Sequence, residues 1–551
     1  MNIAHRLSNR AKETPQKKAV VFPYWDKKNK KYHYESLSFK ELEVRATKYA
    51  QGLKKLGLKK GDKTLLFLKP SLDFSAMTFA LFKLGVIPIF IDPGMGRKNL
   101  LKCIKDCSPV GLIAEPEVHL ARLLFFKNFK SVKYFVTNGK RSWGKMIKMS
   151  DVLKEKVTSF ENLDFDPEDT AAILFTSGGT GTPKGVVYTH GIFENQTSML
   201  QKMYELTEND IDMPGFPLFA LFTIAMGMTS CIPDMDPSKP GSCSPKKLVK
   251  NIQDNNPTFL AGSPAIWERV ADYCLEKNIK LPSVKYLVMF GAPVSVNLHL
   301  KFKSLLVNGT TYTPYGATEA LPVSQIDGKY ILKETASKTE RGLGTCIGKA
   351  VPGLEIKIIK ISDRVIPTLK EATLCSPMEV GEIIVSGPIV TKEYLDLPDK
   401  TNEAKIYETN AQNKLWHRMG DIGYLDEKGD LWFLGRKAHR VETKDYGLLT
   451  PISCEAIFNQ HVDVKRSALV GLGELGNQEP VIVIERKDGL YLSGKERSVF
   501  ENELLKIAKQ YPHTQMIQKI YLSKHFPVDV RHNIKIDRQK LKMEIESHET
   551  H

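Results

Sequence analysis

The chain has 551 residues, of which 42% are apolar, and its 79 basic and 63 acidic residues leave a net charge of +16. This length predicts two or more domains, because single hydrophobic cores stop growing well below it. No run reaches the roughly 20 apolar residues of a membrane span; the best candidate is 218–232, and residues 1–7 lack an apolar signal segment. We therefore expect a soluble, cytoplasmic protein with no transmembrane segment.

The excess positive charge and the cysteines point to neither nucleic acid nor disulfides. Lysine runs such as 27–31 and 54–60 lack the aromatic interleaving of a base-stacking surface, so we expect a solvated lysine face and no nucleic-acid partner. The eight cysteines show neither C-x-x-C spacing nor a dense framework, which predicts reduced, mostly buried thiols.

The first half of the chain alternates helical and extended patterns. Apolar residues recur at helical spacing over 38–56 and 74–84, and short strands are expected over 63–68 and 86–91. Strands alternating with helices predict βαβ units and a parallel sheet. The pattern restarts after residue 185, with helices expected over 191–204, 248–255 and 265–276 and strands over 258–261 and 284–290.

The last third of the chain has a different sequence pattern. Residues 349–430 consist of short β-rich pieces with Pro and Gly turns, which predict a small β-barrel-like subdomain. Further strands and a helix after residue 435 predict a small α+β domain. The expected fold class is α/β: a large N-terminal domain (1–434) of two βαβ-type lobes plus the β subdomain, a hinge (435–438) and a small mobile C-terminal lid (439–551).

In residues 173–185 a short apolar run is followed by a segment that contains four glycines, several hydroxyl side chains and one lysine. Gly178, Gly179 and Gly181 let the backbone come close to an anion, so that successive N–H groups can point inward. Lys184 is followed by a glycine and not by the Ser or Thr of a Walker P-loop, which implies another nucleotide chemistry. An ordinary flexible glycine loop is the alternative; the concentration of donors favours a phosphate cradle.

Four motifs follow this loop: Gly291-Ala-Pro293, Tyr315-Gly-Ala-Thr-Glu319, Met419-Gly-Asp-Ile-Gly-Tyr424 leading to Gly435-Arg436, and Lys535 near the C-terminus. In this order the chain resembles the adenylate-forming superfamily of acyl-CoA synthetases, luciferases and adenylation domains over nearly its whole length. The resemblance implies ATP and Mg²⁺ as cofactors and activation of a carboxylate as an acyl-adenylate. That reaction brings anions together, so it needs donors and cations aimed at developing phosphate charge.

The resemblance also implies a role for each matching residue. Glu319 and the Thr180 hydroxyl would hold Mg²⁺, which prefers oxygen ligands. Asp421, assisted by Arg436, would accept the ribose hydroxyls, and Lys535 would neutralise the reacting oxygens from the lid. The nucleotide-binding residues implied are Thr176, Ser177, Gly178, Gly179, Thr180, Gly181, Thr182, Lys184, Gly291, Ala292, Pro293, Tyr315, Gly316, Ala317, Thr318, Glu319, Asp421 and Arg436; the catalytic residues implied are Lys535, Glu319, Lys184 and Thr180.

Taken singly, these residues have ordinary alternatives. A glutamate such as Glu319 is often a surface helix cap, a Gly-Asp-Ile-Gly segment around Asp421 is as often a structural Asx-turn, and a lysine such as Lys535 is usually exposed to solvent.

Three positions depart from an ordinary acyl-CoA synthetase. The hinge position two beyond Arg436 is Ala438, the position before the C-terminal lysine is Ile534, and the Pro-Leu-Phe-His gate reads Pro217-Leu-Phe-Ala220. These changes leave the adenylation residues intact and remove features of the thioester-forming step.

The same stretches resemble one branch of the superfamily, the β-lactone synthetases of bacterial olefin biosynthesis. The matching segments are 90–95, 219–222, 227–237, 312–319, 435–443 and 526–533. This resemblance implies that a 2-alkyl-3-hydroxy fatty acid and ATP give a β-lactone, AMP and pyrophosphate, the β-hydroxyl attacking the activated carbonyl within one molecule. His439, His532 and Glu442 are candidate bases by position, and each is equally well explained as a structural or exposed residue.

Two alkyl arms require a wide apolar pocket. The residues expected there are Phe219, Leu221, Phe222, Met226, Met228, Gly262, Ser263 and Pro264, although apolar stretches with methionines are more often core. Two other functions stay open, a fatty acyl-CoA synthetase or acyl-AMP ligase and a non-catalytic ATP-binding scaffold. The resemblance implies a small-molecule fatty acid substrate and leaves open peripheral lipid contact and assembly with a lactone decarboxylase and a reductase.

Overall fold

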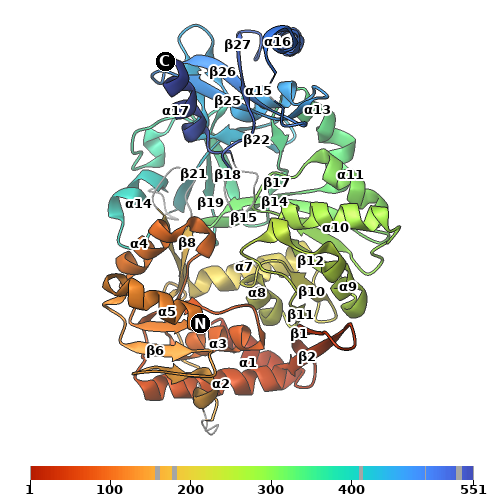
Figure 1. Ribbon diagram of the computed structural model, residues 1–551. Helices are drawn as coiled ribbons and strands as arrows, with labels where there is room; N and C mark the ends of the chain where they lie inside the picture. Colours follow the sequence, from red (N-terminus) through yellow and green to blue (C-terminus); the bar gives the residue numbers. More distant parts are fainter. Residues whose placement is uncertain are drawn as a thin grey trace.

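The computed structural model describes residues 2–154, 160, 162–176, 183–408, 414–490, 492–528 and 536–549. Figure 1 shows a first α/β lobe at the bottom (red to orange), a second α/β lobe beside and above it (yellow to green), a β-rich part above these (green to cyan), and a C-terminal domain at the top (blue). This arrangement confirms the predicted fold class.

The first lobe is built on a seven-stranded sheet. Its strand order is β7 (Ile147–Lys148), β6 (Tyr134–Thr137), β5 (Gly111–Ala114), β3 (Lys63–Phe67), β4 (Ile87–Phe90), β8 (Thr170–Thr176) and β9 (Lys184–Thr189). All neighbours are parallel except the antiparallel pair β8–β9.

Helices cover both faces of this sheet. The core of one face contains α1 (Ala4–Glu13), α2 (Phe39–Leu56) and α3 (Leu72–Leu84), and that of the other contains α4 (Arg97–Cys107). The shorter helices here are η1 (Pro93–Met95), α5 (Pro116–Leu124), η2 (Phe126–Phe129) and α6 (Met149–Val152).

Helix α2 begins and ends on local signals. The Ser38 side chain accepts a hydrogen bond from the Glu41 N–H at 3.2 Å, and Glu41 Oε2 accepts one from the Ser38 N–H at 2.7 Å. This reciprocal capping box satisfies two N–H groups that helix geometry leaves unpaired. The helix ends at Gly57, whose φ of +111° suits glycine. The helix predicted over 38–56 is confirmed.

The second lobe is built on a nine-stranded sheet. Its strand order is β17 (Lys349–Ala350), β15 (Ala320–Asp327), β14 (Thr310–Ala317), β13 (Tyr286–Met289), β12 (Phe259–Gly262), β10 (Ile211–Pro214), β11 (Thr229–Cys231), β1 (Lys18–Asp26) and β2 (Lys31–Ser38). The N-terminal hairpin β1–β2 therefore belongs to this sheet, through the parallel pair β1–β11, which sequence periodicity did not reveal.

Two helical layers enclose the nine-stranded sheet. On one face pack α9 (Pro245–Asn255), α10 (Pro264–Glu276) and α11 (Val296–Leu305), and on the other α7 (His190–Met203) and the end of α8 (Phe219–Ala225). The helices predicted over 191–204, 248–255 and 265–276 are α7, α9 and α10. Small helical segments complete the lobe: η3 (Pro240–Ser242), α12 (Gly328–Tyr330), η4 (Ile331–Thr335) and α13 (Ala336–Glu340).

The β-rich part is a six-stranded sheet. Its strands are β16 (Thr345–Cys346), β22 (Leu431–Arg436), β21 (Lys414–Leu425), β19 (Gly381–Ser386) and β18 (Glu355–Ile359), with β20 (Lys405–Glu408) also paired to β21. Helices η5 (Leu369–Glu371) and α14 (Pro398–Ala404) lie beside it in the chain. Strand β22 continues to Arg436 and the turn η6 covers Lys437–His439, so the predicted hinge begins inside a strand.

The C-terminal domain mixes strands and helices as predicted. A hairpin, β23 (Val441–Thr443) with β24 (Gly447–Leu449), precedes a sheet of β25 (Val464–Leu472), β26 (Glu479–Arg486) and β27 (Lys519–Ser523). Its helices are α15 (Pro451–Phe458), α16 (Gly494–Ala508) and α17 (Arg538–Glu549). All eight cysteines are free thiols and seven are buried, which confirms the prediction. Within the described residues, no helix combines the length and apolarity needed to cross a bilayer.

Candidate active site between the lobes and the C-terminal domain

A cavity of ≈ 2640 Å³ runs between the two lobes and reaches the C-terminal domain. Most of the predicted site residues line it, although they come from six strands or the loops after them and from helix α8. Those that do are Thr176, Lys184, Gly291, Ala292, Pro293, Tyr315, Gly316, Ala317, Thr318, Glu319, Asp421, Arg436, Phe219 and Phe222. Ser177, Gly178, Gly179, Thr180, Gly181, Thr182, His532 and Lys535 lie outside the described residues.

Lys184 lines the cavity directly after the glycine-rich segment. Strands β8 and β9 are antiparallel with Thr176 opposite Lys184, so the glycine-rich segment connects two paired strand ends. Lys184 Nζ lies 4.6 Å from the centroid of the Tyr394 ring. Burial lowers the pKa of Lys184, and the negative charge of Glu319 opposes this shift. The lysine side chain therefore lies against the Tyr394 ring.

Glu319 follows β14 and is held by contacts from residues 391–394. Its Oε1 accepts a hydrogen bond from the Tyr394 hydroxyl at 2.7 Å, and its carbonyl accepts one from the Thr391 N–H at 2.9 Å. No hydrogen bond from the described residues reaches Oε2. One oriented carboxylate oxygen directed at a cavity suits Mg²⁺, which takes few protein ligands and completes its shell with phosphate and water.

Tyr315 and Asp421 meet in the cavity wall. The Tyr315 hydroxyl donates to Asp421 Oδ2 at 2.5 Å, and the Tyr315 ring lies 6.0 Å from that of Phe433, centroid to centroid. Asp421 is 3% exposed, and burial raises its pKa while Arg436 opposes this. Asp421 Oδ1 lies 3.1 Å from Arg436 Nη1 but accepts no hydrogen bond in the described part of the chain. A buried carboxylate oxygen without a donor fits a ribose hydroxyl.

Two of the motifs lie inside strands. Tyr315, Gly316 and Ala317 are the last three residues of β14. Gly420 and Asp421 are inside β21, where the pairing with β22 shifts register after Ile422, so the segment is an irregular strand and no Asx-turn. The irregularity allows Gly420 its φ of +65° and brings Asp421 to Tyr315.

An aromatic cluster forms the apolar part of the cavity. The Phe219 ring lies 4.9 Å from Phe290 and 6.0 Å from Phe222, centroid to centroid, and Phe222 lies 5.9 Å from Phe193. Leu221 and Met226 also line the cavity. This wall comes mainly from α8 and the residues after β13.

Gly262, Ser263, Pro264 and Met228 are not among the lining residues. Ser263 caps α10 by accepting from the Ala265 N–H. A Cβ on Gly262 would meet Ile266 and Trp267, so these residues serve the packing of α10. The structure therefore does not bring this part of the expected pocket to the cavity.

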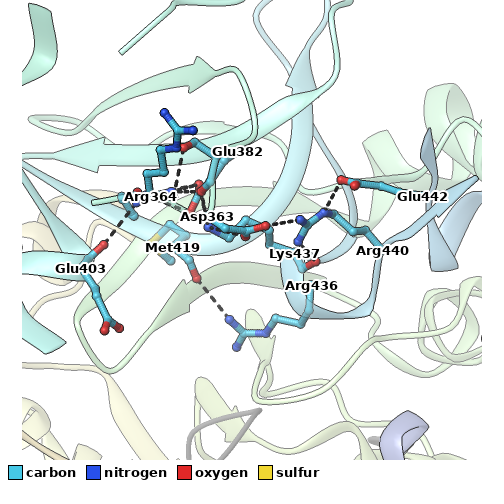
Figure 2. Close-up of polar contacts among 11 residues, drawn as sticks. Asp363, Arg364, Glu382, Glu403, Met419, Arg436, Lys437, Arg440 and Glu442 are labelled. Carbon is cyan, nitrogen blue, oxygen red and sulfur yellow. Dashed lines mark hydrogen bonds and ion pairs between the residues drawn. The ribbon is translucent and has the colours of Figure 1, made fainter. Parts of the chain in front are cut away.

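Charged residues on both sides of the predicted hinge form a network (Figure 2). Lys437 Nζ donates to the Ser362 carbonyl at 2.8 Å and to Glu382 Oε2 at 3.2 Å. Glu382 is 1% exposed and also pairs with Arg418 at 2.6 Å. Arg440 pairs with Asp363 and, at 2.6 Å, with Glu442. The hinge position 438 therefore has no charged side chain, whereas the preceding residue, Lys437, is charged and is paired with Glu382.

Of the three candidate bases, Glu442 and His439 lie in the described part of the chain, and their surroundings differ. Glu442 is paired with Arg440. His439 lines the cavity, and burial, together with Arg538 and Arg436, lowers its pKa to about 4, so its imidazole is neutral at pH 7. Of the two described candidates, His439 alone combines a neutral side chain with a place in the cavity wall.

Sequence reasoning missed a second layer behind Glu319. Lys405, which is buried, donates to the Thr391 carbonyl, and desolvation lowers its pKa to about 7. His417 lies opposite Lys405 in the strand pair β20–β21 and lines the cavity. Its Nδ1 has no hydrogen-bond partner in the described part, and burial followed by the charges of Lys405 and Lys184 holds its pKa well below the usual range. No motif spacing links these residues to Glu319.

Comparison with known proteins agrees with this geometry. The model of the family described as "AMP-binding enzyme" matches residues 7–395. The chain is 39% identical to the olefin β-lactone synthetase of Xanthomonas campestris pv. campestris, over 98% of this chain and 96% of that protein. It is 40% identical to the olefin β-lactone synthetase of Stenotrophomonas maltophilia, over 98% and 97%.

Solved structures show the same fold. ATP-bound MatB from Rhodopseudomonas palustris matches with a TM-score of 0.77 and 19% identity over 100% of both chains. O-succinylbenzoate coenzyme A synthetase (MenE) from Bacillus subtilis, with ATP and magnesium, matches with a TM-score of 0.73 and 21% identity over 98% of this chain and 99% of that one. With the family match covering most of its length, this chain belongs to the AMP-binding enzyme family.

Proposed function

We propose that this protein activates a long-chain 2-alkyl-3-hydroxy fatty acid with ATP and closes it to a β-lactone. The carboxylate attacks the α-phosphate of ATP and pyrophosphate leaves. The β-hydroxyl oxygen then bonds to the acyl carbon, the bond from that carbon to the AMP oxygen breaks, and the hydroxyl proton passes to a base. The observation that carries this proposal is the 39–40% identity to two olefin β-lactone synthetases over almost the whole of each chain.

The adenylation step is assigned to the residues at the phosphate end. Lys184, with the donors of segment 177–182, holds the β- and γ-phosphates, and Glu319, kept in place by Tyr394, holds Mg²⁺ together with Thr180. When bound, Mg²⁺ neutralises phosphate charge and favours departure of pyrophosphate. Lys535 is assigned to the reacting oxygens. This set supplies the positive charge that adenylation needs.

The nucleoside is assigned to the opposite end. Asp421 Oδ1 accepts a ribose hydroxyl while Oδ2 stays bonded to Tyr315, and Arg436 lies beside it. Gly291, Ala292 and Pro293 border the adenine together with the Tyr315 ring. These contacts fix the α-phosphate relative to the acyl pocket. Holding the reacting groups in place in this way lowers the barrier to the reaction.

The acyl chains are assigned to the wall around Phe219 and Phe222, which is apolar and continuous with the nucleotide end of the cavity. His439 is the residue we assign to the hydroxyl proton, because it is neutral and borders the same cavity. Since the nucleophile belongs to the substrate, ring closure needs no second substrate. We further assign residues 1–434 to the AMP-binding domain, 435–438 to the hinge and 439–551 to the lid.

Cytoplasmic location, and assembly with a lactone decarboxylase and a reductase acting on the same acyl chains, are also part of this proposal. A sequence of reactions on such insoluble compounds is favoured when successive enzymes are close together.

A product assay by mass tests the function. The protein is incubated with ATP, Mg²⁺ and a 2-alkyl-3-hydroxy acid, with and without CoA. We expect the yields of lactone and of AMP to be the same with and without CoA. A strict requirement for CoA, with thioester as the product, would instead identify a fatty acyl-CoA synthetase, and bound ATP without turnover would identify a scaffold.

A further inference from the structure

Helix α5 and the turn η2 carry an exposed apolar patch that has no role in the proposed reaction. On α5, Leu120, Leu123 and Leu124 are 57%, 54% and 79% exposed, and Phe126 of η2 is 60% exposed. The leucines are spaced i, i+3 and i+4, so they share one face of the helix. Single exposed apolar residues are ordinary, but four within seven residues form a surface that water solvates poorly.

The opposite side of the same helix is anchored in the first lobe. His119 is buried and its Nε2 lies 3.0 Å from the Val136 carbonyl oxygen, while the Arg122 guanidinium lies 4.0 Å from the centre of the Phe135 ring. Val118 packs against the core that contains α4. Helix α5 is therefore packed firmly against the lobe, and its leucines are exposed although the helix is well anchored.

The segment of the chain that carries the patch is strongly basic. Residues 97–145 contain 11 lysines and arginines and 3 acidic residues, a net +8 of the chain's +16. Among the basic residues, Lys98, Lys127 and Lys130 are exposed and form no ion pair with any described residue. Two of the three acids are paired, Asp106 with Lys102 at 2.6 Å and Glu117 with Lys69 at 3.0 Å. The positive charge is thus largely uncompensated.

The patch adjoins the large cavity. Lys102 of α4 and Glu117 and Val118 of α5 line that cavity, and the first two are exposed to solvent. Both helices belong to the first lobe, and Figure 1 shows them on the same side of it. An apolar surface with basic neighbours therefore lies beside an opening of the cavity that we assign to a long-chain acid.

We infer that this face, which we call the α5 patch (Leu120, Leu123, Leu124 and Phe126), docks on an anionic lipid bilayer. Leucine and phenylalanine side chains enter the boundary between headgroups and acyl chains, while Lys98, Lys127 and Lys130 lie against the anionic headgroups. Charge favours this partner: the exposed Lys98, Lys127 and Lys130 attract a negatively charged membrane, whereas an uncharged apolar protein surface gains nothing from them. Docking beside the cavity would let an insoluble acid enter without crossing water, a consequence that rests on the proposed function.

Vesicle flotation tests the docking, and it needs neither ATP nor acid. The full chain is mixed with phosphatidylcholine vesicles that contain or lack phosphatidylglycerol, at low and high salt. We expect binding to the anionic vesicles, weakened by salt and by loss of phosphatidylglycerol. The double variant Leu124→Ser/Phe126→Ser should bind roughly tenfold more weakly, and Lys127→Glu/Lys130→Glu should lose the preference for anionic vesicles.

The matched control is Val462→Ser/Leu490→Ser, which removes two aliphatic side chains of the C-terminal domain that are 73% and 64% exposed. It should bind like the unaltered protein, and an unchanged thermal midpoint in all variants shows that they fold. Equal binding by the α5-patch variant and the unaltered protein overturns the inference. The inference is also overturned if the unaltered protein does not bind the vesicles. This holds even if the patch proves to bind another protein.

Discussion

The hydroxyl of Tyr315 and the buried carboxylate of Asp421 are joined by a hydrogen bond of 2.5 Å, although 106 residues separate them in the chain. The bond links Tyr315, which we assign to the adenine, to Asp421, which we assign to the ribose. It also uses one carboxylate oxygen and leaves the other without a donor in the described part of the chain.

Tyr315→Phe should raise the KM for ATP about tenfold, because a hydrogen bond to a charged group contributes roughly 1.5–3 kcal/mol. ATP–pyrophosphate exchange measures it. Tyr330→Phe is the matched control, since the Tyr330 hydroxyl bonds Asp430 at 2.7 Å and Tyr330 does not line the cavity. An equal change of KM in both variants would contradict a nucleotide role for the Tyr315–Asp421 pair.

Glu319→Gln retains an acceptor for the Tyr394 hydroxyl and removes the negative charge. We expect adenylation to fall on the order of 100-fold or more, with more Mg²⁺ needed for half-maximal rate. The readout is the Mg²⁺ dependence of pyrophosphate exchange. Glu393→Gln, an exposed side chain nearby, should change neither quantity; an unaltered Mg²⁺ dependence in Glu319→Gln would remove this residue from the metal site.

Phe222→Trp should narrow the apolar part of the cavity, where Phe222 lies between Phe193 and Phe219. We expect kcat/KM to fall at least about tenfold for the longest chains and to change little for short ones, because overpacking affects only substrates that reach the site. Turnover across a chain-length series measures this. Tyr446→Trp, at a side chain that is 57% exposed and does not line the cavity, should leave the profile unchanged, and a uniform loss for all chain lengths in Phe222→Trp would contradict the assignment.

Lys437→Met should lower the free energy of unfolding by roughly 1–2 kcal/mol, because it removes a partner of the buried Glu382 carboxylate (Figure 2). Urea denaturation measures it. Lys360→Met removes an exposed pair with Glu379 and should cost less than about 1 kcal/mol. Equal losses of stability in the two variants would mean that the Lys437–Glu382 contact stabilises the fold no more than an exposed ion pair.

Stability should fall as the pH is lowered below about 6.5. Burial lowers the pKa of His299 to about 4, and its Nδ1 lies 2.8 Å from Thr311 Oγ1. Between pH 6.5 and 4 the unfolded chain binds a proton that folded His299 does not, so acidification favours unfolding by about 1.4 kcal/mol per unit of pH from this group. Urea unfolding at pH 6.5 and 5.5 should show a smaller difference for His299→Gln than for the unaltered protein. An identical pH dependence would contradict this.

The elements that could be predicted are those whose signals are local. Helix α2 has its capping serine and closing glycine within twenty residues of each other, and apolar spacing identifies the buried face between them. The glycine-rich loop and the motifs around Glu319 and Asp421 were found because each concentrates its chemistry in a few consecutive residues. Their order in the chain then identified the superfamily.

What could not be predicted depends on contacts between distant segments. Tyr394 reaches Glu319 across 75 residues, and Lys437 reaches Glu382 across 55. Glu382 stands in an apolar strand, where an isolated acid gives no indication of its partner. Gly262 and Ser263 were expected in the pocket, but Gly262 ends β12 and Ser263 caps α10.

The most direct test of the central claim follows oxygen atoms. The 2-alkyl-3-hydroxy acid is prepared with both carboxylate oxygens as ¹⁸O and incubated with ATP and the protein. Activation of the carboxylate followed by attack of the β-hydroxyl predicts one ¹⁸O in AMP and one in the lactone. Unlabelled AMP with both ¹⁸O atoms in the lactone would mean that the hydroxyl is activated instead, and would contradict the proposed mechanism.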